Sequence, residues 1–331
     1  MRFFYHLLII FLCHSYASKT FAQWHQYTST AMTTKLELEF WCEDTKKAKA
    51  ISTHVFKEFE RIDKLMTRYD AASELSNINR LAFKRTLAVS PELFKVLKKS
   101  HEISALTNGA FDMTFASLGY LYDYRNKRVP TNAEIDKYKK AIDYQHVVLD
   151  EINNTVHFTY LDVKIDLGGI AKGYAVDRGV ELLAKAGVKH ARLSAGGDMR
   201  LLGDKRGKPW LVGIKDPRVT QDRSEHVVAL PLSDVSISTS GDYERFFIDD
   251  NGERIHHIMS PQTGFSAAGV QSVSVLGSDA MTTDGLSTAI FVLGVEKGLA
   301  LVNNMKEVDV IVIDAQRMLH FSEGLMPPTL Q

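Results

Sequence analysis

The stretch VVALPLSDVSISTSGDYERFFIDDNGERIHHI, residues 227–258, decides the fold class, because four short strand-like segments follow one another in it with no helical pattern between them. These segments are VVALPL, VSIST, ERFFID and ERIHHI, and the turn-forming sequence DDNG joins the last two. Short turns connect antiparallel neighbours, whereas parallel strands need a longer crossover that is usually a helix. We therefore expect antiparallel pairing through this part of the chain.

Segments on both sides continue this pattern. Further strands are expected at TTKLELEFWC (33–42), HVVLD (146–150), TVHFTY (155–160), VKIDL (163–167), HARLS (190–194), MRLLG (199–203), WLVGIKD (210–216), VQSVSVL (270–276), VDVIVID (308–314) and MLHFSE (318–323). Because hairpin-like strands outnumber alternating strand and helix units, the sequence predicts an α+β fold with largely antiparallel sheets and packed helices. No repeat or proline-rich linker divides the chain, so we expect one domain over residues 23–331.

Helices are indicated by apolar residues at steps of three or four and by capping residues. They are expected at residues 44–69, between Ser90 and Gly109, from the capping box of Thr131 and Glu134, at residues 170–186 and at residues 281–294.

The first residues, MRFFYHLLIIFLCHSYASKTFAQW, are typical of an export signal, with one arginine, an apolar run and then small residues. The apolar run is shorter than the roughly 20 residues that span a bilayer. We therefore expect residues 1–22 to be a signal peptide that is cleaved near Ala22, although a buried N-terminal helix is the alternative. Cys13 follows the bulky residues Phe11 and Leu12, so lipidation is not expected.

Charge and cysteine content exclude several classes of protein. Lysine plus arginine and aspartate plus glutamate number 40 each, so the chain lacks the excess of positive charge that is typical of nucleic-acid-binding proteins. Once the signal peptide is removed, Cys42 is the only thiol, which leaves no intramolecular disulfide and no cysteine cluster for zinc or iron–sulfur binding. We interpret Cys42 as a packing residue.

The segment KIDLGGIAKGYAVDRGVELL, residues 164–183, places two glycines between an expected strand and an expected helix. The first N–H groups of a helix are unpaired and lie at the positive end of its dipole, so a phosphate can bind there, with Lys172 adding charge. The spacing GGxxxG fits neither the dinucleotide fingerprint GxGxxG nor a P-loop. A plain tight turn with a solvated Lys172 remains the alternative.

The segment TTDGLST, residues 282–288, suggests a metal site. Residues four apart lie on one face of a helix, so Asp284 and Thr288 can present two oxygen atoms to a hard cation such as Mg²⁺. The alternative is that Asp284 caps the helix while Thr288 bonds to a backbone carbonyl.

Two histidines, His256 and His257, precede a turn that contains proline and glycine. Strand alternation sends their side chains to opposite faces, so only one can face a pocket. A histidine in such a pocket could take a proton near neutral pH, although an ordinary surface or core histidine is the alternative.

Seven stretches of the chain occur together in a recognisable order: MTRYDAASELSNIN (66–79), GAFDMT (109–114), DLGGIAKGYAVDR (166–178), SAGGD (194–198), STSGDYERFF (238–247), HHIMSPQTG (256–264) and TTDGLSTAIFVLG (282–294). In this order they resemble the FAD:protein FMN transferase family, the ApbE-like flavin transferases, whose architecture is T-fold-like. The resemblance implies a Mg²⁺-dependent periplasmic enzyme that carries out protein flavinylation. It would transfer FMN from FAD to a Thr or Ser hydroxyl of an acceptor protein and release AMP. It implies FAD and the acceptor as partners, no nucleic acid, and peripheral association with the membrane.

The same resemblance assigns roles to individual residues. The metal ligands would be Asp284, Thr288 and the backbone carbonyl of Gly169. His257 would assist deprotonation of the attacking hydroxyl, and Asp284 would act in catalysis through the metal. The residues that contact FAD would be Met32, Tyr69, Ala110, Phe111, Asp112, Asp166, Lys172 and Ile258.

One departure from the family pattern is Ser260, which stands where an aspartate is usual. Its loss removes a carboxylate near the expected base, which either slows transfer or is compensated by Asp242 or Asp284. Two related functions therefore stay open: hydrolysis of FAD to FMN and AMP, and FAD binding without turnover. A general solute-binding protein would show two doubly wound lobes and is the least favoured.

Overall fold

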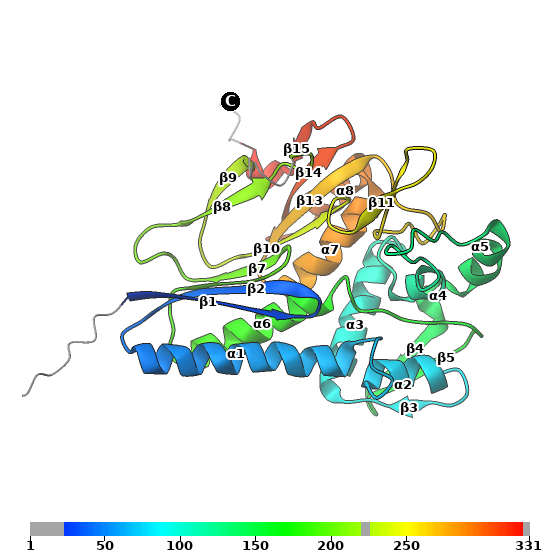
Figure 1. Cartoon of the computed structure of the whole chain (residues 1–331), viewed down its shortest axis with the longest axis horizontal. Coiled ribbons are helices and arrows are strands. Elements are labelled where there is room, and N and C mark those ends of the chain that lie inside the picture. Colours follow the sequence, from blue (N-terminus) through cyan, green and yellow to red (C-terminus); the bar gives the residue numbers. More distant parts are fainter. Residues whose placement is uncertain (1–22, 220–225, 327–331) are drawn as a thin grey trace, which may run out of the picture.

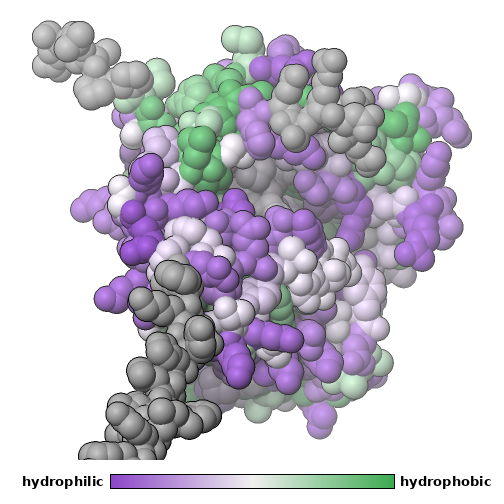
Figure 2. Space-filling view, turned by 60° about the vertical axis from the view of Figure 1, so that its left-hand side comes forward, coloured by the Kyte–Doolittle hydropathy of each residue, from purple (hydrophilic) through white to green (hydrophobic). Residues whose placement is uncertain are grey.

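The computed structural model describes residues 23–219 and 226–326. The predicted signal peptide, residues 1–22, lies outside the described residues. Among the described residues, no helix is both long enough and apolar enough to cross a membrane. The face that Figure 2 brings forward is mostly hydrophilic, with its hydrophobic residues gathered mainly toward the upper edge.

An eight-stranded sheet forms the centre of the molecule (Figure 1), and every pair of neighbouring strands in it is antiparallel. In spatial order its strands are β1 (Gln23–Ala31), β2 (Thr34–Cys42), β6 (Ala191–Ala195), β7 (Asp198–Leu202), β10 (Ser236–Gly241), β13 (Val270–Gly277), β14 (Asp309–Asp314) and β15 (Leu319–Phe321). The α+β fold with antiparallel sheets that the sequence predicts is thereby confirmed.

Helices cover one face of this sheet and a hairpin covers the other. On the first face lie α1 (Thr45–Met66), α6 (Ala171–Lys185) and α7 (Ala280–Leu293), and α8 (Val295–Asn303) follows α7. On the second face, Trp210, Val212 and Ile214 from the hairpin of β8 (Trp210–Lys215) and β9 (His226–Leu232) pack against the sheet. The middle of the sheet is therefore buried on both sides, which explains why all eight residues of β13 are buried.

A second group of elements extends from one end of the sheet, on the right in Figure 1. It comprises α2 (Glu74–Leu81), β3 (Leu87–Ala88), α3 (Pro91–Leu106), α4 (Ala116–Gly119), α5 (Asn132–Tyr138), β4 (Val147–Asp150), β5 (Thr155–Phe158), and the short 3₁₀ helices Met113–Phe115, Lys139–Ala141 and Tyr144–His146. A further 3₁₀ helix, Glu323–Leu325, follows β15, and the two-stranded hairpin of β11 (Phe246–Ile248) and β12 (Arg254–His256) precedes β13. The predicted caps are confirmed: the Ser90 hydroxyl accepts from Leu93 N–H, and Thr131 and Glu134 form a capping box.

The expected strand at residues 163–167 is wrong. Side chains take most of its backbone hydrogen bonds: Ile165 N–H donates to Asn79 Oδ1 at 2.7 Å, and Ile165 C=O accepts from Asn79 Nδ2 at 2.9 Å. Tyr120 also donates to this carbonyl at 2.8 Å. Asp166 N–H donates to the backbone carbonyl of Met113. An asparagine that satisfies both backbone groups of one residue replaces the ladder, and no local alternation of apolar residues reveals this.

Candidate functional site

Helices α6 and α7 cross at Gly173, and this crossing builds the site. A Cβ atom placed on Gly173 would lie 2.1 Å from the carbonyl oxygen of Ala280, so only glycine allows this approach. The N–H of Gly173 donates to Asp284 Oδ2 at 3.0 Å. The second turn of α7 is thereby fixed against the first turn of α6, which brings the segments 164–183 and 282–288 together.

Asp177 on α6 holds the start of α7. Its carboxylate accepts from the N–H groups of Ala280 and Met281, both at 2.9 Å, and pairs with Arg200 at 2.6 Å. These N–H groups belong to the first turn of α7 and have no partner inside the helix. Asp177 therefore acts as a tertiary cap that positions α7, in addition to the ordinary N-cap at Asp279.

Lys172 lies between two carboxylates. Its ammonium is 2.6 Å from Asp198 Oδ2 and 3.4 Å from both carboxylate oxygens of Asp284. Desolvation lowers the pKa of Lys172, but Asp198 and Asp284 outweigh this effect and the pKa is raised. Burial, followed by the nearby charge of Asp198, raises the pKa of Asp284 to about 7. Two buried carboxylates with one ammonium leave one negative charge without a partner, and such a group either takes a proton or attracts a cation.

The three predicted metal ligands are brought together. Asp284 and Thr288 lie one turn apart on α7, and Thr288 Oγ1 is 3.3 Å from where a Cβ atom on Gly169 would lie. Ser240 on β10 adds a hydroxyl 3.4 Å from Thr288 Oγ1. The alternative that Asp284 caps α7 is wrong, because Asp279 is the N-cap and accepts from Thr282 N–H at 2.8 Å.

This donor set fits a hard divalent cation. It offers one carboxylate, one hydroxyl and a backbone carbonyl, all oxygen ligands of the kind that Mg²⁺ accepts while keeping several waters. Within residues 23–219 and 226–326, no group of three or more His, Cys, Asp or Glu side chains could hold a metal.

The two histidines differ in burial, as the alternation of side chains along a strand predicts. His256 is buried, its Nε2 lies 2.9 Å from the carbonyl of Ala267, and its ring packs edge-on against Phe291. His257 is partly exposed, and its Nδ1 lies 3.3 Å from the carbonyl of Arg245. A carbonyl can only accept, so Nδ1 carries the proton and Nε2 is left to accept one. Desolvation, followed by the positive charge of Arg245, lowers the pKa of His257 to about 4, and Lys172 contributes to the same effect.

The loss of the family carboxylate at Ser260, and the compensating role considered for Asp242, can be compared with the contacts of these two residues. Asp242 forms a bidentate ion pair with Arg218, at 2.7 and 2.6 Å, so its carboxylate is already engaged. Ser260 makes a tight turn, in which its N–H donates to Phe265 C=O and its C=O accepts from Gly264 N–H. The carbonyl of Arg245 therefore takes the orienting position beside His257.

Several residues that the resemblance assigns to FAD lie around the same loop. Phe111 is buried, and its ring edge is 3.3 Å from where a Cβ atom on Gly169 would lie. Asp166 accepts from Gly168 N–H at 2.7 Å and pairs with Arg68 at 3.5 Å. Together with Lys172, these groups enclose the turn at the start of α6.

The other assigned residues are less directly placed. Tyr69 is 69% exposed and is covered by the guanidinium of Arg68, 4.6 Å from its ring centre, so Arg68 links Tyr69 to Asp166. Met32 lies in the turn between β1 and β2 at a positive φ of 51°, with its N–H bonded to Asp63. Ala110 and Ile258 are buried.

Asp112 has a structural role that its position in the motif does not reveal. It is buried and accepts hydrogen bonds from the Thr114 N–H and hydroxyl and from Tyr144 N–H. Burial outweighs these bonds and raises the pKa of Asp112 to about 6. Its carboxylate joins the 3₁₀ turn Met113–Phe115 to the 3₁₀ turn Tyr144–His146, so it supports the loop that carries Ala110 and Phe111.

Three residues with clear roles in the site are absent from the sequence prediction: Arg68, Asp177 and Asp198. Each lies inside a quoted motif, but its partner is distant in sequence. Asp198 meets Lys172 across 26 positions, and Asp177 meets α7 across more than 100. The presence of these charged residues inside the motifs is the only local signal for them.

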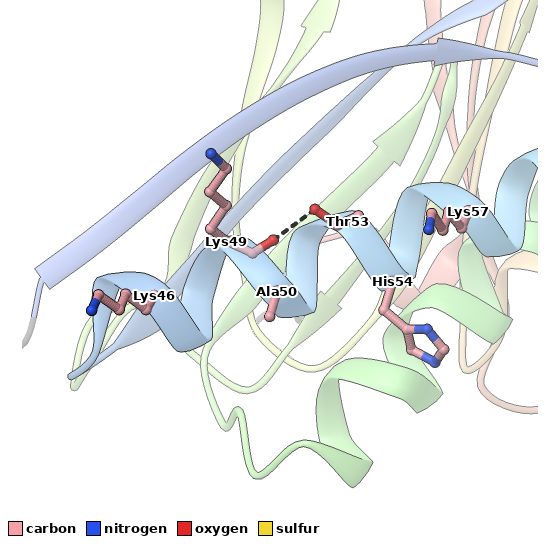
Figure 3. A pocket seen from close by; sticks show the side chains of 6 residues that line it. All are labelled: Lys46, Lys49, Ala50, Thr53, His54 and Lys57. Carbon is pink, nitrogen blue, oxygen red and sulfur yellow. Dashed lines mark hydrogen bonds between the residues drawn. The ribbon is translucent and has the colours of Figure 1, made fainter.

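A hollow on the exposed side of α1 is separate from this site. Figure 3 shows its lining: Lys46, Lys49, Ala50, Thr53, His54 and Lys57. The one hydrogen bond drawn there joins the Thr53 hydroxyl to the Lys49 carbonyl, a bond within the helix. No motif residue lines this hollow, so the chemistry is to be sought at the crossing of α6 and α7.

Comparison with known proteins connects this arrangement to one family. The model of the ApbE family matches residues 32–312. The chain is 34% identical to the FAD:protein FMN transferase of Vibrio cholerae, over 77% of this chain and 76% of that protein. It is 30% identical to the FAD:protein FMN transferase of Klebsiella pneumoniae, over 88% of this chain and 90% of that protein.

Solved structures agree with these sequence matches. The ApbE protein of Thermotoga maritima superposes with a TM-score of 0.83 and 33% identity, covering 91% of this chain and 98% of that one. The flavin transferase ApbE of Vibrio cholerae superposes with a TM-score of 0.81 and 30% identity over the same shares.

Proposed function

The chain belongs to the ApbE family, and from this premise we propose that it is an FAD:protein FMN transferase that uses a divalent cation, Mg²⁺ in the first place. As in the relatives that carry this name, the substrate is FAD and the acceptor is a protein. The enzyme transfers the FMN half of FAD to a Thr or Ser hydroxyl of the acceptor and releases AMP. Residues 1–22 direct it to the periplasm, where it associates peripherally with the membrane.

The observation that carries this proposal is the crossing of α6 and α7. It places the start of α6 and the ammonium of Lys172 beside the oxygen donors Asp284 and Thr288. A pyrophosphate needs positive charge along its length, which a helix N-terminus and a lysine supply. Bound at Asp284, Thr288 and the Gly169 carbonyl, the cation would neutralise charge on the phosphates.

His257 supplies the remaining requirement, a group that accepts the proton of the attacking hydroxyl. Its Nδ1 is held by the Arg245 carbonyl, and its pKa of about 4 keeps Nε2 unprotonated throughout the neutral range. A base with a low pKa removes a hydroxyl proton only weakly, so positioning and charge neutralisation contribute more than base strength.

One experiment separates transfer from the two alternatives, hydrolysis and binding without turnover. The purified protein is incubated with FAD, Mg²⁺ and a panel of candidate acceptor proteins, and AMP release and acceptor mass are followed. An acceptor that gains the mass of FMN supports transfer, AMP without a mass gain identifies a hydrolase, and neither product identifies a binding protein.

Two variants test the roles within this reaction. Asp284→Ala should abolish the dependence of turnover on Mg²⁺ together with most of the turnover. His257→Ala should leave FAD binding nearly intact and slow transfer by about 10²-fold or more, the usual contribution of a general base. Unchanged transfer in both variants would refute the assignment.

A further inference from the structure

The Lys172 ammonium occupies the position from which a cation would neutralise Asp284. We propose that Lys172 is the resident cation of this site, that Asp198 holds it there, and that the pair keeps the affinity for divalent cations low while no FAD is bound. The inference rests on the proposed function and adds a mode of regulation to it. Lys172 and Asp198 would then determine when the metal binds, and Lys172 would also contact the substrate.

The geometry supports this competition. Asp198 is only 2% exposed, and its strongest contact is the 2.6 Å ion pair with Lys172. The ammonium is 3.4 Å from both oxygens of Asp284, so it faces the whole carboxylate rather than one lone pair. One oxygen of Asp284 also accepts from Gly173 N–H at 3.0 Å, which holds the carboxylate in place.

The positive charge of Lys172 should lower the affinity of the site for a divalent cation. An ammonium this close to Asp284 repels a second cation that binds the same carboxylate, and the repulsion is strong because the carboxylates of Asp284 and Asp198 are buried. Removing the ammonium leaves Asp198 and Asp284 with two uncompensated negative charges, so a divalent cation should then bind more tightly. Removing the charge of Asp198 has the opposite effect, because Lys172 is then neutralised by Asp284 alone.

The side chain of Lys172 is 27% exposed, so it can be reached from solvent. The phosphates of FAD offer it a new anionic partner at the start of α6, where they would draw it from Asp284. The alternative is a purely structural lysine that fixes Asp284 in the geometry a metal requires. In that case the loss of Lys172 lowers metal affinity, and the two roles therefore predict opposite changes.

The test measures binding of Mn²⁺ to the purified protein without nucleotide, by electron paramagnetic resonance, with Mg²⁺ titration calorimetry as a second probe. Lys172→Gln should bind Mn²⁺ at least about tenfold more tightly than the unaltered protein. Asp198→Asn should bind it more weakly. Lys172→Arg, which keeps the charge, should stay close to the unaltered protein. Lys185→Gln, at the exposed end of the same helix, is the matched control and should change nothing.

Several outcomes would overturn the inference. The first is Mn²⁺ binding in Lys172→Gln that is unchanged from, or weaker than, that of the unaltered protein. The second is Mn²⁺ binding in Lys172→Arg that is as tight as in Lys172→Gln. The third is tighter Mn²⁺ binding in Asp198→Asn than in the unaltered protein. Circular dichroism of each variant establishes that the fold is retained. Release of AMP from FAD by the unaltered protein is measured separately. If no AMP is released, the proposed function is refuted. If AMP release is normal but the order of Mn²⁺ affinities is wrong, only this inference is refuted.

Discussion

Replacing Gly173 by alanine should disable the site while leaving most of the fold in place. The added methyl group would lie 2.1 Å from the Ala280 carbonyl oxygen and 2.8 Å from Asp284 Cβ. Ordinary contact begins at 3.4 Å, so α6 and α7 must separate by about 1.3 Å at this point. Forced overpacking of this kind costs about 1–3 kcal/mol of unfolding free energy, and a displacement of about 1 Å at a reacting centre costs about 10²-fold in rate.

The assay compares urea unfolding with Mg²⁺-dependent release of AMP from FAD. Gly179→Ala is the matched control, because it lies on the same helix and gains the same helix propensity of about 1 kcal/mol. The nearest atoms to its new methyl group belong to the buried side chains of Leu193, Phe59 and Val55, at 2.4, 3.2 and 3.3 Å, so the packing cost falls on the core instead of on the backbone of α7. We expect a far greater loss of activity in Gly173→Ala than in Gly179→Ala. Equal activities in the two variants would show that the close approach of the helices does not position the site.

Three further changes test the supports of the site. Asp177→Ala leaves two N–H groups of α7 and one arginine without their partner. The free energy of unfolding in urea should therefore fall by about 2–4 kcal/mol. Loss of the ordinary N-cap at Asp279 should lower it by only about 1 kcal/mol. Asn79→Ala removes the partner of the Ile165 N–H and one of the two partners of the Ile165 carbonyl, which keeps Tyr120. It should destabilise by about 1–3 kcal/mol in the same measurement, whereas no change would mean that water replaces the amide. The pKa of His257, about 4, lies below that of an unfolded chain, so the unfolded state binds this proton first as pH falls. Stability relative to His257→Gln should therefore decrease by about 1–3 kcal/mol between about pH 6.5 and pH 4, and parallel stability curves would contradict the low pKa.

Local pattern predicted most of the strands and helices, because their signals lie within a few residues. The hairpin of β11 and β12, the capping box at Thr131 and the long first helix are examples. The two preceding strands were also predicted, but β9 pairs with β8, and β10 pairs with β7 and β13. Part of what the pattern missed depends on distant partners. Residues 163–167 alternate like a strand, but a side chain from α2 takes their hydrogen bonds. Strand β1 was missed because it directly follows the expected signal peptide, where a weakly apolar alternation was not recognised as a strand.

The site was predicted as a set of residue types rather than as an arrangement. Helical spacing correctly placed Asp284 and Thr288 on one face of α7. It could not show that Lys172 would lie against Asp284, because that contact depends on the crossing of two helices whose sequences are more than 100 positions apart. The crossing depends in turn on Gly173, which local sequence reasoning treats as one more glycine after a turn.

Ser260 stands where the family usually has an aspartate, and the hydrogen-bond partner of the His257 ring is the carbonyl of Arg245. A carboxylate near His257 would stabilise the protonated ring and raise its pKa, whereas the carbonyl of Arg245 orients the ring with no negative charge. Desolvation, followed by the positive charge of Arg245, lowers the pKa of His257 to about 4, although the hydrogen bond to the Arg245 carbonyl acts in the opposite direction. The unprotonated form therefore predominates at neutral pH, and its affinity for a proton is low. If the chain transfers FMN as proposed, we expect transfer to depend more on Lys172 and on a cation at Asp284 than on proton removal by His257.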